Sequence, residues 1–332
     1  MTAATVSGKA RDALAAPPRR KAEVGFGDLF ALTLRQNRLA IGLCVLMYVL
    51  FGLLVLTTNG QATIGYWRFD PKEFTLALAV VIAMFWGAPL LATEYEQRTS
   101  LVVWSQDVTP LRWLLAKLTL LGGLVAVLSG LLSIVVGTQA AAEADINPVP
   151  FSALEPYGLI GYEAWLPLSL VYALFGFFFG VAVGGLVRRT VNAIGITLVG
   201  FVGIRLLVMD ELRPWLLAHL ITPVRVTWPL TGWVTLNPSV AGAPGAKDYI
   251  VNFDLWLNAA GRPVAFPDNC GSLADKPFVS CMAAHGIVTS GQDFQPASRI
   301  LAFQSVELAL YVVLIAVSIG LAVWSLRRKA IM

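Results

Sequence analysis

Long uncharged apolar runs alternate with short polar stretches along most of this chain. A bilayer core about 30 Å thick needs about 20 apolar residues in a helix, and six runs meet or approach that length. They cover residues 39–57, 74–93, 118–138, 165–187, 191–209 and 300–326. The pattern predicts an all-α membrane protein with six transmembrane helices.

The composition agrees with this pattern. Of the 332 residues, 57% are hydrophobic and 13% are charged, whereas an ordinary soluble domain carries about 25% charged residues. The composition thus argues against a soluble enzyme. Lys and Arg exceed Asp and Glu by 24 to 20, but the basic residues lie beside the apolar runs and do not form one face for nucleic acid.

Most of the basic residues lie in four segments: before the first run, between the second and third, between the fourth and fifth, and after the sixth. They include Arg35, Arg38, Arg98, Arg112, Lys117, Arg188, Arg189, Arg327, Arg328 and Lys329. Because short loops rich in Lys and Arg stay in the cytoplasm, these segments and both chain termini are expected inside the cell. An even number of spans agrees with this, because it places both termini on the same side of the membrane. On the other side, the first connection has Arg68 and Lys72, and residues 210–298 carry both signs of charge.

The regions outside the spans differ in character. Residues 1–23 predict a disordered basic tail that favours an anionic membrane surface. Residues 24–38 mix apolar and charged side chains and predict an amphipathic helix at the membrane interface. Residues 210–299 predict an extracellular cap, because the segment is too long for a simple connector, and residues 327–332 predict a cytoplasmic tail.

The chain has three cysteines. Cys44 lies in the first run and is interpreted as a small buried apolar residue. Cys270 and Cys281 lie in the external segment, and we predict a disulfide between them because external thiols are usually oxidised. The alternative is two free thiols, and no Cys/His spacing indicates a metal site.

Ionisable residues at mid-membrane depth often mark an ion pathway. The apolar runs contain two candidates, Arg205 and Glu307, each near the outer end of its span. We predict a structural ion pair between them, with snorkelling of both side chains to water as the alternative. Neither residue has the position of a proton relay.

Three glycines recur every four residues in the fourth run: Gly176, Gly180 and Gly184. Small residues at this spacing share one helix face and let backbones approach closely. They predict a helix-packing seam, within the subunit in the favoured reading and between subunits in the other.

A site for ATP hydrolysis would require a glycine-rich phosphate loop ending in Lys and Ser or Thr. The most similar string, residues 242–248, has the wrong spacing, lacks the hydroxyl residue and is expected outside the cell. We interpret it as a turn, so the chain is not expected to be an enzyme.

The connection between the second and third runs is the most informative polar segment. It carries both signs of charge and an apolar patch around Trp104, followed by Thr109 and Pro110 in the positions of a helix N-cap and first helical residue. This order predicts a short cytoplasmic helix at about 96–108 and a turn back into the membrane. An apolar patch rimmed by charge is typical of a docking surface, and the alternative is a helix resting on lipid headgroups.

At this segment the sequence resembles the ABC type 2 exporter permeases, particularly an actinobacterial-like subgroup. The resemblance rests on an acidic stretch that ends in Thr, a Trp-x-Gln element, a Trp-x-x-x-Lys element, a glycine-rich stretch at 180–190 and a Phe-Gln-Pro-Ala-Ser-Arg stretch at 294–299. In the first three elements the matching residues are Glu94, Glu96, Thr99, Trp104, Gln106, Trp113 and Lys117. Where the subgroup usually has an aromatic pair, this chain has Ile300 and Leu301.

The resemblance implies a multi-pass permease subunit of the bacterial cell membrane. Such a subunit pairs with a second permease, a copy or a homologue, and with two separate ATPase subunits that bind ATP and Mg. The helix between the second and third spans would be the coupling helix seated in the ATPase. The residues implied to touch or orient that partner are Glu94, Glu96, Arg98, Thr99, Trp104 and Gln106.

Because this chain has no phosphate loop, uphill transport would draw its free energy from the ATPase through alternating access. The resemblance places the cavity near the second and fifth spans, with Phe85, Trp86 and Phe201 as lining candidates, although core packing explains them equally well. The apolar spans favour an amphipathic or hydrophobic cargo such as a drug, a peptide antibiotic or a lipid. The alternatives are a channel or ion-coupled secondary transporter, a membrane-embedded enzyme, and a non-transporting sensor or assembly subunit.

Overall fold

The structure is a computed structural model that describes residues 25–57, 62–64, 67–69, 75–97, 109–146, 157, 159–230, 244–245, 247–273 and 275–327. The predicted basic tail at 1–23 and nearly all of the predicted coupling helix, residues 98–108, lie outside this description.

Helices dominate the described chain. They are α2 (Phe26–Thr57), α3 (Thr75–Ile82), α4 (Ala88–Glu96), α6 (Pro110–Ile146), α7 (Leu159–Glu163), α8 (Leu166–Val187), α9 (Thr190–Leu206), α10 (Arg213–His219), α11 (Asp275–Ala284) and α12 (Ile300–Arg327). Two π-helical turns, η3 (Ala83–Gly87) and η4 (Leu207–Leu212), join α3 to α4 and α9 to α10 without a break, and η5 (Asp268–Cys270) and η6 (Ala297–Arg299) are short 3-10 turns.

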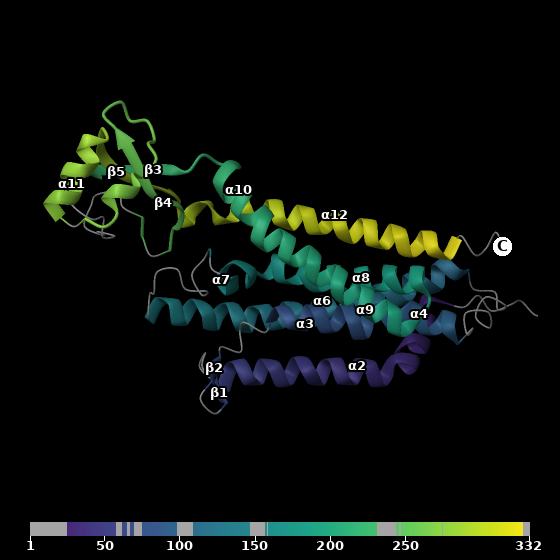
Figure 1. Ribbon diagram of the computed structural model, residues 1–332. Helices are drawn as coiled ribbons and strands as arrows, with labels where there is room; N and C mark the ends of the chain where they lie inside the picture. Colours follow the sequence, from purple (N-terminus) through teal and green to yellow (C-terminus); the bar gives the residue numbers. More distant parts are fainter. Residues whose placement is uncertain are drawn as a thin grey trace, which may run out of the picture.

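Six helices of the described part are long and apolar enough to cross a membrane. Their bounds are Phe26–Thr57, Ala77–Glu96, Pro110–Ala142, Leu166–Val187, Thr190–His219 and Ala297–Arg327. All six predicted spans are thus present as helices, and the chain is a mostly helical, multi-pass membrane protein. Figure 1 shows them side by side as one bundle, with the start of α2 and the C-terminal end of α12 at the same end.

Helix α8 is the centre of this bundle. It contacts α3, η3, α4, α6, α7, α9 and α12. Its first turn contains Pro167, which suits a helix start because its missing N–H has no acceptor there, and its last residue is followed by Arg188 with a left-handed φ of 61°. By contrast α2 lies at the edge of the bundle and exposes most of its leucines.

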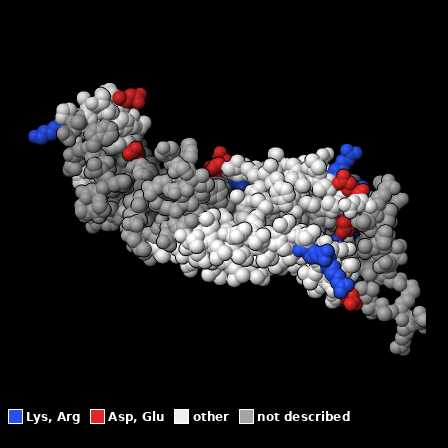
Figure 2. Space-filling view, turned by 90° about the horizontal axis from the view of Figure 1, so that it is seen from below, with Lys and Arg blue, Asp and Glu red and all other residues white. Residues whose placement is uncertain are grey.

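On one face of the bundle, charged residues are absent from the middle (Figure 2). In Figure 2 the face in view has a wide band without Lys, Arg, Asp or Glu, and charges gather at the end opposite the cap and near the cap itself. Such a band is what a hydrocarbon environment selects.

Two predicted helix boundaries differ from those in the structure. Helix α2 runs without interruption across the expected junction at residue 38, and Leu29 and Thr33 in its first turns are buried against the bundle. The fifth span continues through η4 and α10 to His219, ten residues beyond Met209, because the π-helical turn keeps the backbone hydrogen-bonded through the polar residues Asp210 and Glu211.

The all-α prediction is wrong for the segments outside the bundle. Strands β1 (Ala62–Ile64) and β2 (Trp67–Phe69) form an antiparallel hairpin after α2. In the cap, β3 (Val224–Pro229), β4 (Tyr249–Asn258) and β5 (Ile287–Gln295) form an antiparallel sheet in the order β3-β5-β4. Residues Trp256, Phe278, Met282 and Ile287 form a small apolar core between this sheet and α11.

The predicted disulfide is present. Cys270 and Cys281 are bonded and join η5 to α11 across the cap core. Their sulfurs lie close to His285, but a disulfide offers no thiolate to a metal ion. Cys44 is a free thiol in α2.

Hydrogen bonds attach the cap to the bundle at the end of α10. The Gln295 side chain is fully buried and its Nε2 donates to the carbonyl oxygens of Leu217 and Ile221, at 2.9 and 2.6 Å. The Tyr157 hydroxyl donates to the carbonyl oxygen of Pro296 at 2.8 Å. Burial, followed by the nearby charge of Asp248, raises the pKa of Tyr157, so this donor stays protonated at neutral pH.

Candidate functional site

The end of α4 is anchored to the start of α6 by a buried ion pair. Glu94 Oε1 accepts a hydrogen bond from Lys117 Nζ, and the Lys117 side chain is only 2% exposed. The ammonium also lies 4.2 Å from the centre of the Trp113 ring, in a cation–π contact. Trp113 and Lys117 form the Trp-x-x-x-Lys element. This element therefore fixes α6 to α4 through the ion pair of Lys117 with Glu94.

A second acidic residue anchors α4 to α9. Glu96 Oε2 accepts from the backbone N–H of Thr190 at 3.1 Å and from its hydroxyl at 2.7 Å. Thr190 is the first residue of α9, where backbone N–H groups lack helical partners and the helix dipole attracts negative charge. Glu96 thus caps the fifth span from another helix.

The turn between α8 and α9 receives a further contact from α4. Arg188 adopts a left-handed conformation that is costly for a residue other than glycine. Its guanidinium lies 5.5 Å from the centre of the Tyr95 ring. Three successive residues of α4, Glu94, Tyr95 and Glu96, therefore contact either α6 or the α8–α9 turn.

The remaining predicted coupling residues, Arg98, Thr99, Trp104 and Gln106, lie outside the described residues. The description resumes at Thr109, whose Oγ1 accepts from the backbone N–H of Arg112 at 3.4 Å. Pro110 is the first residue of α6, so the expected order of N-cap and first helical residue is present.

The glycine ridge of α8 packs on the second span. A Cβ atom built on Gly176 would lie 2.8 Å from the carbonyl oxygen of Ala79, and one on Gly180 or Gly184 would approach the carbonyl oxygens of Ala83 and Ala88 even more closely. No side chain fits at these distances, so the seam lies within the subunit and places α8 directly against α3, η3 and α4.

A buried cluster of four charged residues occupies the part of the bundle nearest the cap. Arg205 Nη2 and Arg213 Nη2 donate to Glu163 Oε1 at 2.7 and 2.9 Å. Arg213 also donates through Nε and Nη2 to the two oxygens of Glu307, both at 3.1 Å. The predicted pair is part of this cluster, since Arg205 Nη1 lies 3.8 Å from Glu307 Oε1. All four side chains are buried, which argues against snorkelling.

Two tyrosines complete the cluster. The hydroxyl of Tyr172 donates to Glu307 Oε1 at 2.6 Å, and the hydroxyl of Tyr311 accepts from Arg205 Nη1 at 3.0 Å. The Arg205 guanidinium lies 3.7 Å from the centre of the Tyr172 ring. Two Arg and two Glu leave the cluster without net charge. Each of the four is within ion-pair distance of an opposite charge, which offsets the cost of burying it.

Sequence reasoning found half of this cluster. The expectation that only Arg205 and Glu307 are ionisable groups inside the bundle is wrong, because Glu163 and Arg213 are buried with them. The sequence did not single out Glu163, because its connection, residues 139–163, contains no Lys or Arg and also carries Glu143, Asp145 and Glu155.

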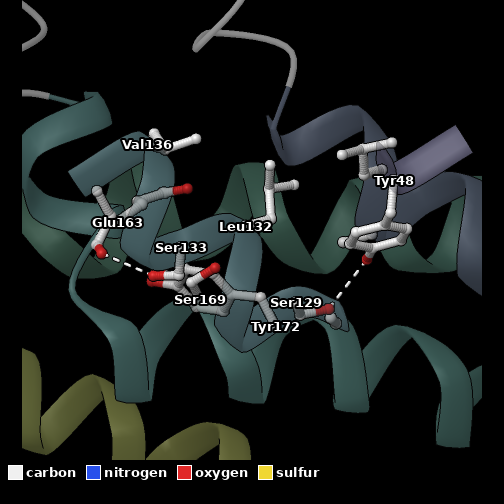
Figure 3. A pocket seen from close by; sticks show the side chains of 12 residues that line it. Tyr48, Ser129, Leu132, Ser133, Val136, Glu163, Ser169 and Tyr172 are labelled. Atoms are coloured by element: carbon white, nitrogen blue, oxygen red, sulfur yellow. Dashed lines mark hydrogen bonds between the residues drawn. The ribbon is translucent and has the colours of Figure 1, made fainter. Parts of the chain in front are cut away.

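A small cavity lined by both apolar and polar side chains adjoins the cluster. Figure 3 shows its lining, which includes Tyr48, Ser129, Ser133, Glu163, Ser169 and Tyr172. Tyr48 and Ser129 are joined by a hydrogen bond of 2.9 Å, and Ser133 donates to the carbonyl oxygen of Ala164 at 2.8 Å. The second oxygen of Glu163 has no partner among the described residues. A cavity of about 40 Å³ has room for water.

Larger cavities lie between α2 and the second span, and they contain two of the three predicted lining residues. Phe85 and Trp86, both in η3, line two adjoining cavities of about 300 Å³ each. Phe201 lies elsewhere, stacked on Phe175 with ring centres 5.6 Å apart in a separate apolar cluster. The three residues therefore do not form one site in this subunit.

Comparison with known proteins gives one result. No curated protein and no solved structure matches this chain. Residues 65–213 match the family described as ABC-2 membrane transporter related. The match covers somewhat less than half of the chain. It spans the second to fifth membrane helices and includes Glu94, Glu96 and the glycine ridge. It supports an ABC-2 type permease of an ABC transporter, a family that works with ABC ATPase partners.

Proposed function

We propose that this chain is the membrane-spanning permease subunit of an ATP-driven exporter in a bacterial cell membrane. The observation that carries the proposal is the match at 65–213 on a bundle with six candidate spans. The ATP and Mg would be bound by two separate ATPase subunits, and the transport path would be completed by a second permease, a copy or a homologue.

The contacts of α4 indicate how force from an ATPase would enter the bundle. Along the sequence, residues 97–109 connect Glu96, the last residue of α4, to Pro110, the first residue of α6. A partner that moves this segment would pull on Lys117 through Glu94 and on the start of α9 through Glu96. Because the glycine ridge seats the second span directly on α8, such a pull would move these helices as a unit, as a rigid-body change of access requires.

The cargo in this proposal is an amphipathic or hydrophobic compound, such as a drug, a peptide antibiotic or a lipid. The cavities beside Phe85 and Trp86 support this class, because one is lined mainly by apolar side chains and the adjoining one by polar side chains. A site with an apolar part beside a polar part is typical for amphipathic small molecules.

One observation favours a second function, an ion-coupled secondary transporter. Buried charges inside a membrane bundle often mark ion pathways, and among the residues that the structure describes four such charges form one cluster, besides the Glu94–Lys117 pair. Their mutual pairing favours a structural role instead, because both Arg and both Glu side chains have partners within the cluster.

The test is ATP hydrolysis by the ATPase subunit copurified with this chain in lipid nanodiscs, measured across a panel of amphipathic compounds. Hydrolysis should depend on the complex, rise with some compounds and fall in a Glu94→Ala/Glu96→Ala variant. The matched control is Asp210→Ala/Glu211→Ala, which removes two exposed acidic residues near the other end of the bundle and should leave hydrolysis unchanged. If no ATPase copurifies and the chain alone moves solute or current, the exporter function is wrong and the secondary transporter replaces it.

A further inference from the structure

A continuous groove runs between α2 and the second span. Its two parts are the adjoining cavities described above, which share the lining residues Ala40, Phe85 and Trp86. Phe85 and Trp86 occupy the π-helical turn η3, and such turns recur at functional sites. The groove has two chemically distinct ends.

One end is apolar and open to the membrane. Its lining consists of Ala40, Leu43, Cys44, Met47, Val81, Ile82, Phe85 and Trp86. Leu43 and Phe85 are 67% and 62% exposed, so an acyl chain can reach this end directly from the bilayer.

The other end is polar and contains two buried groups without partners. Besides the shared residues it is lined by six polar residues, Gln36, Asn37, Thr93, Glu94, Gln97 and Lys117, and by Pro89 and Leu90. Trp86 is only 5% exposed, and its Nε1 donor has no acceptor among the described residues. The Oε2 atom of Glu94 likewise has no donor there. Leaving buried polar atoms unpaired is costly, so this end favours a ligand that supplies both an acceptor and a donor.

The charges at the polar end limit which ligand headgroups can bind there. Glu94 and Lys117 neutralise each other, so a ligand headgroup without net charge fits best. A positive group with N–H donors would satisfy Glu94 Oε2, and an anionic oxygen would accept from Trp86 Nε1. Lys117 lines the same cavity and would add a favourable charge for that oxygen. A quaternary ammonium has no N–H to donate, whereas a primary ammonium has three.

The depth of the groove agrees with a lipid in one leaflet. Lys117 lies seven residues after Pro110, about 10 Å along α6, so the polar end is near the end of the bundle. From Asn37 to Met47 is ten residues of α2, or about 15 Å, which is about half of a bilayer core of about 30 Å.

The geometry points to a binding site for a membrane phospholipid whose headgroup carries a phosphate and a primary ammonium, as in phosphatidylethanolamine. The ammonium lies at Glu94 Oε2, the phosphate at Trp86 Nε1 and Lys117, and an acyl chain along Leu43, Met47 and Phe85. The site lies in the same cavities that support the proposed cargo class and names one lipid for them. Its binding requires neither the ATPase nor transport, so a failed crosslinking test and a failed hydrolysis test can be told apart.

The test is photo-crosslinking of the purified chain in phosphatidylcholine nanodiscs. The probe is phosphatidylethanolamine with a diazirine in one acyl chain, and crosslinked peptides are mapped by mass spectrometry. Crosslinks should concentrate at residues 40–47 and 81–86. Unlabelled phosphatidylethanolamine should compete, whereas added phosphatidylglycerol or phosphatidylcholine should compete weakly.

Three variants complete the test. Trp86→Phe keeps an aromatic side chain and removes the N–H donor, and should lower crosslinking about tenfold, as expected for one hydrogen bond to a charged group. Leu43→Trp should block the apolar end. The matched control is Val49→Trp, at an exposed position on the opposite face of the same helix, which should crosslink like the wild type. Crosslinks spread evenly around α2, equal competition by phosphatidylglycerol, or no effect of Trp86→Phe would each overturn the site.

Discussion

Arg205 and Arg213 donate to the same oxygen atom, Oε1 of Glu163, although eight residues of one continuous helix separate them. In a regular α-helix eight residues turn through about 800°, which leaves the second side chain about 80° away from the first. The π-helical turn η4 lies between them and inserts one extra residue, so the rotation falls to about 700° and both guanidinium groups point the same way. The π-helical turn is therefore what builds the cluster.

The first prediction concerns the coupling between Arg205 and Glu307. Removing either side chain leaves an uncompensated buried charge, so Arg205→Ala and Glu307→Ala should each destabilise the protein by about 3–5 kcal/mol. Because the two residues share partners, their effects should not add, with an interaction energy of about 0.5–3 kcal/mol. This energy is measured by thermal unfolding of the wild type, the two single variants and the double variant in nanodiscs. Additive effects would show that Arg205 and Glu307 do not interact.

The matched control for that cycle is an exposed pair in the cap. Arg225 donates to both oxygens of Asp293 at 2.7 and 2.9 Å across β3 and β5, and these hydrogen bonds raise the pKa of Arg225. Solvent screens this pair, because the Arg225 side chain is 45% exposed. Its cycle should give only about 0.2–1 kcal/mol.

The second prediction concerns the glycine ridge. Gly180→Ala would place a methyl group against the carbonyl oxygen of Ala83 and force α8 away from η3, at a cost of about 1–3 kcal/mol. Gly195→Ala, in α9, meets no atom within 4 Å and should be neutral or slightly stabilising, because alanine is the better helix former. Both variants are compared by thermal unfolding in the same lipid, and equal stabilities would contradict the seam.

The positions of the six spans could be predicted because a bilayer demands a long apolar run at each crossing. The fourth span begins and ends within one residue of its predicted limits, and the disulfide followed from the external location of Cys270 and Cys281. The limits of the fourth span and the disulfide could be predicted because they depend only on the sequence at those positions.

The charge cluster and the cap sheet could not be predicted in the same way. The cluster joins Glu163, Arg213 and Glu307 from three separate helices, and the alignment depends on the π-helical turn, which no residue pattern in the fifth span indicated. In β4 the pairing shifts between Ile250 and Asn252 and again between Asn252 and Leu255. These irregularities break the alternation of buried and exposed residues that would have indicated a strand.

The third prediction concerns the disulfide. Cys270 is fully buried in the cap core, and its bond to Cys281 closes a loop with a sequence separation of 11. The entropy of such a loop corresponds to about 3 kcal/mol of stabilisation. Cys270→Ala/Cys281→Ala should therefore loosen the cap, with faster amide exchange in α11 and β5, while exchange in α8 stays unchanged. Equal exchange in α11 with and without the bond would show that the cap core alone holds the fold.

The last prediction is a pH dependence at the junction of cap and bundle. In the folded protein the pKa of Tyr157 is raised by burial and by Asp248, above its ordinary value of about 10. Below pH about 10 tyrosine is protonated in both the folded and the unfolded chain, so the stability contribution is fully present there. As the pH rises further the unfolded chain releases this proton first, and the stability falls.

Tyr157→Phe cannot release a proton, so it should lose less stability between pH 8 and pH 11 than the wild type does. At pH 8 it should be less stable by about 1 kcal/mol, because the hydrogen bond to Pro296 is missing. Unfolding at the two pH values measures both effects, and parallel losses in the two proteins would show that Tyr157 ionises freely in the folded state.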